Sequence, residues 1–246
     1  MSTPAATPPP QPGSASWWRQ RYADRAGRRP RVGGLSLEAI TGAALEIADR
    51  DGLDALTMRR LADHLGTRHT SLYRHVASRE ELLVELVDRV LAEVVLPAEQ
   101  PDWRAAVAAG ARAFRRVLRD HPAVAPLFVA GQLLGPNAMR AREHGLGLLI
   151  RAGWPPASAV HIYLTLMHFV IGAAQMDAGG AARTADQRAA MADLFASLPA
   201  DTHPVVRKHA ELLNTPDSDQ EFDFGLQSLL DGIGSRPDHP DHAEGP

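Results

Sequence analysis

Apolar residues recur every three or four positions through the first third of the chain, in short stripes bounded by residues that favour helix ends. Ser36 precedes the first stripe and Gly52 follows it, so we expect a helix between them that is capped by the Ser36 hydroxyl. Thr57 precedes a second stripe that stops at Gly66, a residue suited to a tight turn. The pattern therefore predicts two helices, of which the second is the shorter.

Two further helices are predicted directly after this turn. Thr67 can cap a third helix over residues 68–74, in which few positions are apolar. Ser78 followed by Glu81 forms a capping box, which predicts a fourth helix that runs to about Leu96. Four helices are thus expected to follow one another within the first hundred residues.

The second and third predicted helices, with the turn at Gly66 between them, have the spacing of a helix-turn-helix. In this motif the first helix supports the second, and the second enters the major groove of DNA. The third helix and its end carry mostly hydrogen-bonding side chains, which are Arg68, His69, Thr70, Ser71, Tyr73, Arg74 and His75. Arginine pairs with guanine edges, and hydroxyl groups bind phosphates or bases. Taken alone, a polar helix this short is better explained as a solvated surface helix.

The rest of the chain is also predicted to be helical. Aromatic residues make up only 5% of the 246 residues, and the apolar content is largely Ala and Leu, so an all-α fold is expected. The chain contains no cysteine, which excludes disulfides, thiolate catalysis and Cys-ligated metal sites. Its single lysine, Lys208, does not follow glycine, which excludes a Walker phosphate loop; G-x-S-x-G and H-E-x-x-H do not occur. These absences argue against an enzyme, and no cofactor is expected.

Charge is distributed unevenly along the chain, although the net charge is only −3. Residues 17–34 carry six arginines against one aspartate, whereas the last 46 residues carry ten acidic residues. We expect residues 1–34 to be a disordered basic arm, which either contacts DNA or is only a solubilising leader. The adjacent Trp17 and Trp18 do not fit a pure leader, and they allow packing on the body or on a partner subunit. Residues 234–246 are expected to be a disordered tail.

Residues 36–93 resemble the TetR family of bacterial transcriptional regulators. The runs that carry the resemblance are AALEIA at 43–48, GLDALTMRRLA at 52–62, LG at 65–66, SLYRHV at 71–76 and SREELL at 78–83. The resemblance implies a three-helix DNA-binding head over residues 35–80. It also implies that the fourth helix links this head to a helical ligand-binding and dimerisation body over residues 81–233.

The resemblance also assigns DNA contacts to individual side chains by their position in the matching motif. It implies that Arg59 contacts DNA from the second helix and that Arg79 binds a phosphate at the start of the fourth. The groove-facing and phosphate-facing set of the third helix is His69, Thr70, Ser71, Tyr73, Arg74 and His75. Tyr73 and His75 are expected to contact the DNA backbone. The candidates for reading bases are Arg68, His69 and Arg74.

Beyond residue 101 the resemblance continues, toward the branch of the family that includes the tetracycline repressor. It is carried by FRRVLR at 114–119, AGW at 152–154, HFVIGA at 168–173 and EFDFGL at 221–226. It implies a body in which two helices per subunit, at about 156–178 and 219–232, form a four-helix dimer interface. Phe128 stands where that branch has a metal-binding histidine, so neither tetracycline nor a metal ion is expected as a ligand.

An effector pocket is expected inside this body, lined by apolar side chains and a few polar ones. The candidate residues are Phe128, Leu133, Leu148, Met167, His168, Gln175 and Met176. Methionine and phenylalanine at helical spacing are equally typical of plain core. His161 and His168 lie on one helix face, but no third ligand stands at suitable spacing, which favours packing histidines over a metal site.

The most apolar stretch, residues 160–174, is shorter than the roughly 18–20 residues that span a membrane. We therefore expect a cytoplasmic protein without a membrane segment. The expected function is that of a homodimeric repressor, which a small molecule releases from a pseudo-palindromic double-stranded DNA operator. An activator with the same head and a ligand-independent DNA-binding dimer are the alternatives.

Overall fold

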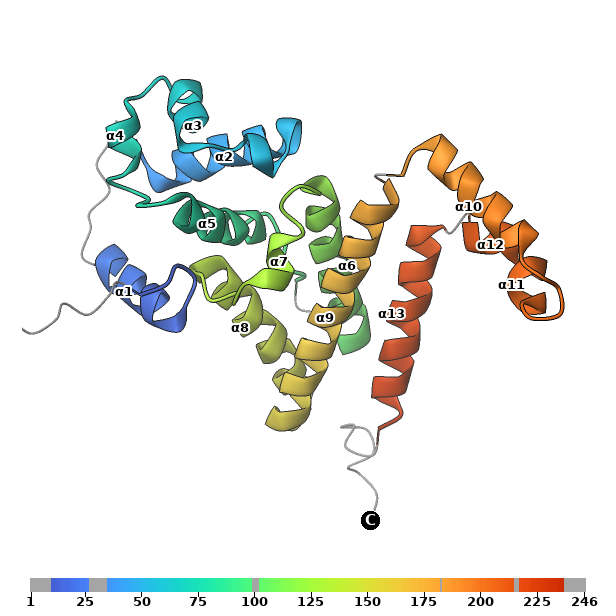
Figure 1. The fold of residues 1–246 in the computed structure, drawn as a ribbon. Helices are drawn as coiled ribbons and strands as arrows, with labels where there is room; N and C mark the ends of the chain where they lie inside the picture. Colours follow the sequence, from blue (N-terminus) through green and yellow to red (C-terminus); the bar gives the residue numbers. More distant parts are fainter. Residues whose placement is uncertain (1–9, 27–34, 99–101, 182, 215–216, 237–246) are drawn as a thin grey trace, which may run out of the picture. The chain divides into compact units, whose positions relative to one another are not determined.

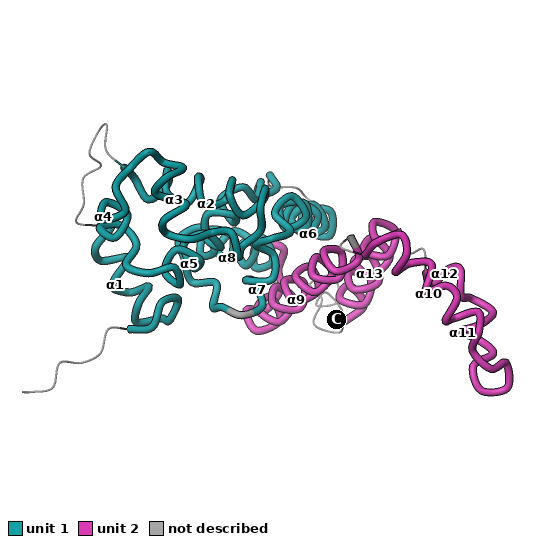
Figure 2. The backbone as a smooth tube through the Cα atoms, turned by 45° about the horizontal axis from the view of Figure 1, so that its top comes forward, with its two compact units in different colours: residues 1–151 teal, residues 152–246 magenta. Residues whose placement is uncertain are grey.

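The computed structural model of the chain is helical throughout the part that it describes, and no strand occurs there. The described residues are 10–26, 35–98, 102–181, 183–214 and 217–236. They divide into two compact units, residues 1–151 and 152–246, which are coloured separately in Figure 2. The all-α fold expected from the composition is confirmed.

Unit 1 contains the first eight α-helices and one short 3₁₀ turn, η1 (Figure 1). They are α1 (Ala15–Ala26), α2 (Leu37–Asp51), η1 (Leu53–Ala55), α3 (Met58–His64), α4 (His69–Leu72), α5 (Arg79–Leu91), α6 (Trp103–Asp120), α7 (Leu127–Ala130) and α8 (Pro136–Arg151). Unit 2 contains α9 (Pro156–Ala181), α10 (Ala185–Ser197), α11 (Pro204–Lys208), α12 (Ala210–Asn214) and α13 (Ser218–Gly234).

We call α2 to α4 the head. Its first two helices begin directly after the capping residues that the sequence predicts. The Ser36 hydroxyl accepts a hydrogen bond from the Ala39 backbone at 3.0 Å, and Thr57 caps α3 in the same way. Gly52 and Gly66 end the two helices with φ of 83° and 59°, values that favour glycine. The core beneath these helices consists of wholly buried side chains, which are Ile40, Ala44, Ile47, Leu56, Leu61, Leu72, Val76, Leu82 and Leu86. The first two predicted helices are confirmed.

The third predicted helix is shorter than expected, and Thr67 is not its cap. The Thr67 backbone N–H donates to the Ala62 carbonyl at 3.0 Å, so Thr67 closes the preceding helix α3 instead. Helix α4 begins at His69 and ends at Leu72, whose carbonyl accepts from the N–H groups of both His75 and Val76. Residues 73–75 therefore form a turn after the helix.

The fourth predicted helix, α5, begins as expected and ends earlier. Ser78 accepts from the Glu81 backbone at 3.2 Å, while the Glu81 carboxylate accepts from the Ala77 backbone at 2.7 Å. The helix ends at Leu91 and not near Leu96, because the N–H groups of residues 92–94 bond to carbonyls three residues earlier. Hydrogen bonds of this kind form the tighter turns of a 3₁₀-helix, so the α-helix does not continue beyond Leu91.

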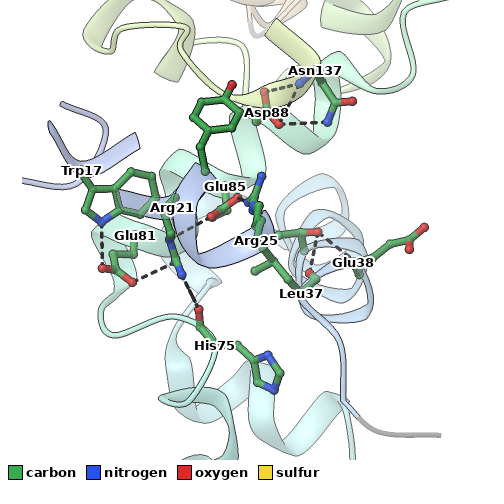
Figure 3. Close-up of polar contacts among 12 residues, drawn as sticks. Trp17, Arg21, Arg25, Leu37, Glu38, His75, Glu81, Glu85, Asp88 and Asn137 are labelled. Carbon is green, nitrogen blue, oxygen red and sulfur yellow. Dashed lines mark hydrogen bonds and ion pairs between the residues drawn. The ribbon is translucent and has the colours of Figure 1, made fainter. Parts of the chain in front are cut away.

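The structure corrects the expectation that residues 1–34 form a disordered arm. Residues 15–26 are the helix α1, in which Trp17 and Trp18 are only 5% and 3% exposed. Helix α1 lies against the N-terminal part of α5, as Figure 3 shows for Trp17 and Glu81. Both neighbouring tryptophan rings are therefore buried together. Residues 27–34, the other half of the basic segment, lie outside the described residues.

In unit 2, α9 and α13 pack side by side (Figure 1). The rings of Phe169 and Phe222 stack between them with centroids 5.1 Å apart. Gly225 permits this approach, since a Cβ there would lie 2.8 Å from the Phe169 ring. The two helices expected at 156–178 and 219–232 are therefore present, and the residues of the expected tail from 237 onward lie outside the described part.

Helix α9 is longer than the apolar stretch read from the sequence. Within residues 156–180 an 18-residue stretch reaches a mean hydropathy of 1.5, so by length and composition alone this segment is able to span a membrane. The expectation that no stretch is long enough is corrected, because alanine and glycine extend the helix beyond the most apolar run. A single such helix is weak evidence for a membrane span, since the core helix of a globular protein has the same properties.

Candidate DNA-binding site

Helices α3 and α4 are held together by apolar side chains on their inner faces. Leu61 and Leu72 are wholly buried, and Val76 anchors the turn that follows α4 in the same core. Both helices lie with α2 at one end of unit 1 (Figure 1). The buried side of α4 is thus fixed by Leu72, which leaves its other sides for contact with a ligand.

The polar side chains predicted to contact DNA lie on these open sides. Most of the set is exposed, and two members are half-buried. The exposed residues are Arg68, His69, Thr70, Tyr73 and Arg74, and the half-buried ones are Ser71 and His75. The rings of His69 and Tyr73 meet edge to face, with centroids 5.0 Å apart, so each limits the rotation of the other. The structure therefore brings the predicted set together around one short helix.

The arginines of the head differ in whether a protein group already holds them. Arg59, Arg68 and Arg74 are exposed, and their guanidinium groups have no hydrogen-bond or ion-pair partner among the described residues. In contrast, Arg60 pairs with Asp51, which also accepts from its neighbour Arg50 at 2.8 Å. Three guanidinium groups are thus available to bases or phosphates, and these three belong to the predicted set.

Arg79 has a different environment from the other predicted DNA-contacting residues. Its Nε and Nη2 donate to the carbonyls of Leu56 and Leu53, at 2.9 and 2.8 Å. These bonds tie the start of α5 to the 3₁₀ turn that precedes α3. One edge of the guanidinium is therefore occupied, and a phosphate contact by Arg79 depends on the N–H groups that remain, two on Nη1 and one on Nη2.

Sequence reasoning missed a set of contacts between α1 and the end of the recognition segment. Both terminal nitrogens of Arg21 donate to the His75 carbonyl at 3.2 Å, and Nη2 also pairs with Glu81 at 3.2 Å (Figure 3). Trp17 donates from Nε1 to the other Glu81 oxygen at 3.0 Å. Helix α1 thus holds the turn after α4 in place. The sequence signals for this docking were the adjacent Trp17 and Trp18, which do not fit a pure leader, and the arginines of the same segment.

A second ion pair fixes α1 along α5. Arg25 donates to the buried Glu85 carboxylate at 2.7 Å, and Arg21 lies 3.4 Å from its other oxygen. Burial raises the pKa of Glu85 above its ordinary value, and the two guanidinium groups partly oppose that shift. The charge of Glu85 is therefore compensated only while α1 is docked.

Asp88 connects α5 to the start of α8. Its oxygens accept from the backbone of Asn137 and Ala138 and from the Asn137 side chain, at 3.0 to 3.3 Å (Figure 3). Burial raises the pKa of Asp88, although these hydrogen bonds favour its charged form. Gly135 makes the approach possible, because a Cβ at that position would lie 2.2 Å from Asp88 Oδ1.

His121 connects the head to the body within unit 1. Its ring, at the end of α6, is bound through Nδ1 to Asp49 of α2 at 2.8 Å and through Nε2 to Glu93 at 3.0 Å. Burial opposes a charge on this ring, but the hydrogen bonds that the ring donates to the Glu93 and Asp49 carboxylates outweigh it and raise the pKa of His121. A charged imidazole can donate to both carboxylates at once, whereas a neutral one donates to only one.

The predicted effector-pocket residues belong to both units. Phe128 is 3% exposed, and its ring centroid lies 5.9 Å from that of Phe114, as in an ordinary core contact. Leu133 and Leu148 are half-buried in unit 1. In α9, Met167 and Gln175 are half-buried, whereas His168 and Met176 are exposed. No cluster of three metal-binding side chains occurs among the described residues.

Comparisons with known proteins identify both halves of the chain. Residues 40–86 match the family described as bacterial regulatory proteins, tetR family, and residues 96–236 match the tetracyclin repressor-like C-terminal domain. The HTH-type transcriptional repressor DrrR1 of Streptomyces coeruleorubidus is 37% identical over 220 residues, which cover 84% of this chain and 81% of that protein. The class A tetracycline repressor from transposon 1721 of Escherichia coli is 29% identical over 221 residues, which cover 86% and 96%.

Solved structures agree with these relatives. The TetR family protein ActR of Streptomyces coelicolor, in complex with actinorhodin, has a TM-score of 0.74 and 34% identity. This match covers 82% of the present chain and 96% of ActR. The second family domain alone covers more than half of the chain, and the exposed helix-turn-helix lies within the first. The chain therefore belongs to the TetR family of transcriptional regulators, with a DNA-binding helix-turn-helix head and a tetracycline-repressor-like body.

Proposed function

We propose that this protein is a homodimeric repressor whose two α4 helices enter successive major grooves of a pseudo-palindromic operator. The observation that carries the proposal is the exposed polar surface of the helix-turn-helix, with three arginines that no described residue holds. Guanidinium groups without a protein partner, held around a helix that is anchored by one buried face, are suited to contacts with guanine edges and phosphates. Relatives named as repressors support repression over activation.

The proposed roles of individual residues in this complex are those that the family motif implies, with Arg79 assigned anew from its contacts. Arg68, His69 and Arg74 contact base edges. Tyr73, His75 and Arg59 contact the sugar-phosphate backbone, and Thr70 and Ser71 supply further hydroxyl contacts. Arg79 acts mainly on the protein side, by fixing the turn before α3, and reaches a phosphate only through the guanidinium N–H groups that these two bonds leave free.

Dimerisation is proposed to use α9 and α13. Both helices carry large apolar side chains that the single chain leaves uncovered, among them Val160, Leu164 and Phe224, which are 42%, 37% and 77% exposed. Apolar surface on two neighbouring helices is typical of subunit contacts, where its burial stabilises the dimer. Covering this surface in a dimer also accounts for the high hydropathy of α9 in a cytoplasmic protein.

Release from the operator is proposed to follow when a small molecule binds in the body. The support is the resemblance to ActR, whose structure has been solved with actinorhodin. The proposed pocket residues remain those expected from the sequence: Phe128, Leu133, Leu148, Met167, His168, Gln175 and Met176. A ligand changes operator binding only if it prefers one state of the protein, and a preference of about 1–3 kcal/mol is typical.

The direct test is binding of the full chain to its own promoter DNA, followed by fluorescence anisotropy. Arg68→Ala is expected to weaken binding to the preferred site by roughly tenfold or more, because a base contact is lost. Arg183→Ala removes the same charge from an exposed position of unit 2 and is expected to leave the affinity unchanged. Equal binding of both variants would contradict the assignment of α4 as the recognition helix.

Repression itself is tested in cells. Deleting the gene is expected to raise expression of a reporter behind that promoter, and complementation is expected to lower it again. A fall in reporter expression on deletion would instead identify an activator with the same DNA-binding head.

A further inference from the structure

His121 joins the head to the end of α6 through a pair of carboxylates. Its ring is bound to Asp49 of α2 on one side and to Glu93, which follows α5, on the other, at 2.8 and 3.0 Å. The side chain of His121 is 11% exposed, whereas those of Asp49 and Glu93 are 31% and 34% exposed. A nearly buried ring therefore lies between two partly exposed carboxylates that come from different elements.

The backbone of His121 is held at the end of α6, so the ring has a defined position. Its N–H donates to the Val117 carbonyl at 3.2 Å, and its own carbonyl accepts from the N–H groups of Val124 and Ala125. The carboxyl end of a helix carries a partial negative charge, which favours a positive ring at this place. The charged ring thus ties Asp49 of the head to a hydrogen-bonded part of unit 1.

The charged groups that face the ring come from two elements. Asp49 faces it from α2 and Glu93 faces it from the segment after α5, while Arg89 of α5 pairs with Glu93 at 2.9 Å. Burial lowers the pKa of His121, but its hydrogen bonds to Glu93 and Asp49 outweigh that effect and raise the pKa above 6.5. The ring is therefore charged in the folded protein below pH 6.5, and it loses the proton as the pH rises through the folded pKa.

Loss of the proton weakens both contacts of the ring. A neutral imidazole has one N–H, so it donates to one carboxylate and turns a lone pair toward the other. The bond that remains no longer joins opposite charges, and such bonds are about half as strong. Glu93 keeps Arg89 as a second partner, whereas His121 is the partner of the Asp49 side chain among the described residues. Deprotonation therefore loosens α2 from the end of α6.

We propose that His121 is a positioning residue for operator binding, whose charged ring holds the head in place and so raises the affinity for DNA with two half-sites. The inference rests on the operator binding proposed above. A dimer on a pseudo-palindrome has to place both heads at once, and a loosely held head loses its freedom when the second half-site is occupied. A firmly held head avoids much of that cost. His121 acts through Asp49 and does not contact DNA itself.

Protonation and operator binding are then coupled in both directions. If a proton on the ring raises the affinity for the operator by some factor, operator binding raises the affinity of the ring for the proton by the same factor. The pKa of His121 should therefore be higher in the operator complex than in the free protein. The complex should also take up protons when it forms above pH 6.5.

The test is the pH dependence of the binding of the full chain to its own promoter DNA, followed by fluorescence anisotropy at constant ionic strength. Between about pH 6 and pH 9, the affinity of the wild type is expected to fall roughly five- to tenfold more than that of His121→Gln, which carries no charge. His69 and His75 also titrate, but both proteins contain them, so the difference reports on His121. Equal profiles with intact binding, or a difference of the opposite sign, would overturn the inference.

His64→Gln is the matched control. His64 of α3 pairs with Glu46 of α2 at 3.0 Å, so this histidine–carboxylate pair lies within the head and does not reach α6. Its loss is expected to leave the profile of the wild type unchanged, and an effect equal to that of His121→Gln would contradict the assigned role. Asp49→Asn keeps the ring and removes the carboxylate on the head, so it should reduce the pH dependence as His121→Gln does. A full wild-type profile in Asp49→Asn would overturn the inference even if His121→Gln folds poorly.

A DNA fragment with a single half-site separates positioning from a simple effect of charge. Only one head has to be placed on it, so the difference between the wild type and His121→Gln is expected to disappear. A ring that merely adds positive charge near DNA would give the same difference on both fragments, which would contradict the positioning role.

Nuclear magnetic resonance of the imidazole signals provides the reciprocal measurement. The signal of His121 is identified by its absence in His121→Gln, and its midpoint is expected at a higher pH in the operator complex. An unchanged or lower midpoint would overturn the inference. Failure of the wild type to bind its promoter DNA at any pH would instead contradict the proposed function, and the inference with it.

Discussion

At the scale of single residues, the arginines of the head show what distinguishes a DNA-contacting side chain from a structural one. Arg74 is exposed with no described partner, whereas Arg79, five residues later, is bound to two backbone carbonyls. Both are arginines next to a helix end, and the sequence alone assigned both to DNA. Only the position of the Leu53 and Leu56 carbonyls, more than twenty residues away in the chain, separates their roles.

Arg74→Ala is expected to reduce the preference of the protein for its operator. The loss should be about 1–3 kcal/mol at the base that Arg74 contacts, with a smaller loss on unrelated DNA. Competition anisotropy with single-base operator variants measures this directly. If the ranking of the operator variants stayed the same as for the wild type, Arg74 would be a phosphate contact and not a base contact.

Gly135→Ala is expected to destabilise the protein by about 1–3 kcal/mol, because the new methyl group would collide with the buried Asp88 carboxylate. Gly42→Ala is the matched control: it lies inside α2, where a Cβ would meet nothing within 4 Å. There the change should be neutral or stabilise by roughly 0.5–1 kcal/mol. Urea unfolding of both variants tests the pair, and equal stabilities would show that α8 shifts freely away from α5.

At the scale of elements, α1 acts as a brace for the recognition segment. It has no counterpart in the first family domain, which begins at residue 40, yet it reaches the carbonyl of His75 directly after α4. Its contacts run to Glu81 and Glu85 of α5 and, through the Tyr22 hydroxyl, to the Leu134 carbonyl at 3.0 Å. One helix thus touches the head, the linking helix and the α7–α8 segment.

Arg21→Ala is expected to weaken operator binding roughly three- to tenfold, because the turn after α4 loses its external support. The base preference should stay unchanged, since Arg21 is not assigned to DNA. Arg19→Ala removes an equal charge from an exposed position on the same helix and is the control. Hydrogen exchange at the His75 and Val76 amides should accelerate in the Arg21 variant alone. Equal losses of affinity in both variants would mean that only the charge of α1 matters.

The elements that could be predicted from the sequence were those defined by local signals. Ser36, Thr57 and Ser78 each cap a helix through the backbone N–H three residues later, so their positions follow from the chain itself. The docking of α1 depends on Glu81 and Glu85, about sixty residues distant, and no local pattern reports such a pairing. The residues predicted to contact DNA also lie close together because of local sequence, since nearly all of them belong to one short helix and the residues beside it.

At the scale of the whole molecule, the end of α6 is one of the places where the head contacts the body within unit 1. His121 lies at that junction, between Asp49 of the head and Glu93 beyond α5. Charge on the ring stabilises both contacts at once. The state of one imidazole therefore contributes to how firmly the head is held.

The raised pKa of His121 predicts that the free energy of unfolding of the protein depends on pH. The folded-state pKa of His121 is raised above the ordinary value of 6.5, so its contribution is complete below that value and is lost as the pH rises through the folded pKa. The free energy of unfolding of the wild type should therefore fall, relative to that of His121→Gln, as the pH rises above 6.5. Urea titrations at several pH values measure the difference. A constant offset between the two proteins would show that the ring is not charged in the native state.

The brace formed by α1 also has a consequence for how such regulators diverge in evolution. A substitution of a base-contacting side chain in the recognition segment alters which operators are recognised. Such substitutions are therefore limited by the operators that the protein has to bind. Arg21 touches only a backbone carbonyl of that segment, and α1 lies outside both family domains. Substitutions in α1 can therefore change the strength of operator binding while the recognised sequence stays the same. Duplicated regulators that share an operator thus have a route to different response thresholds.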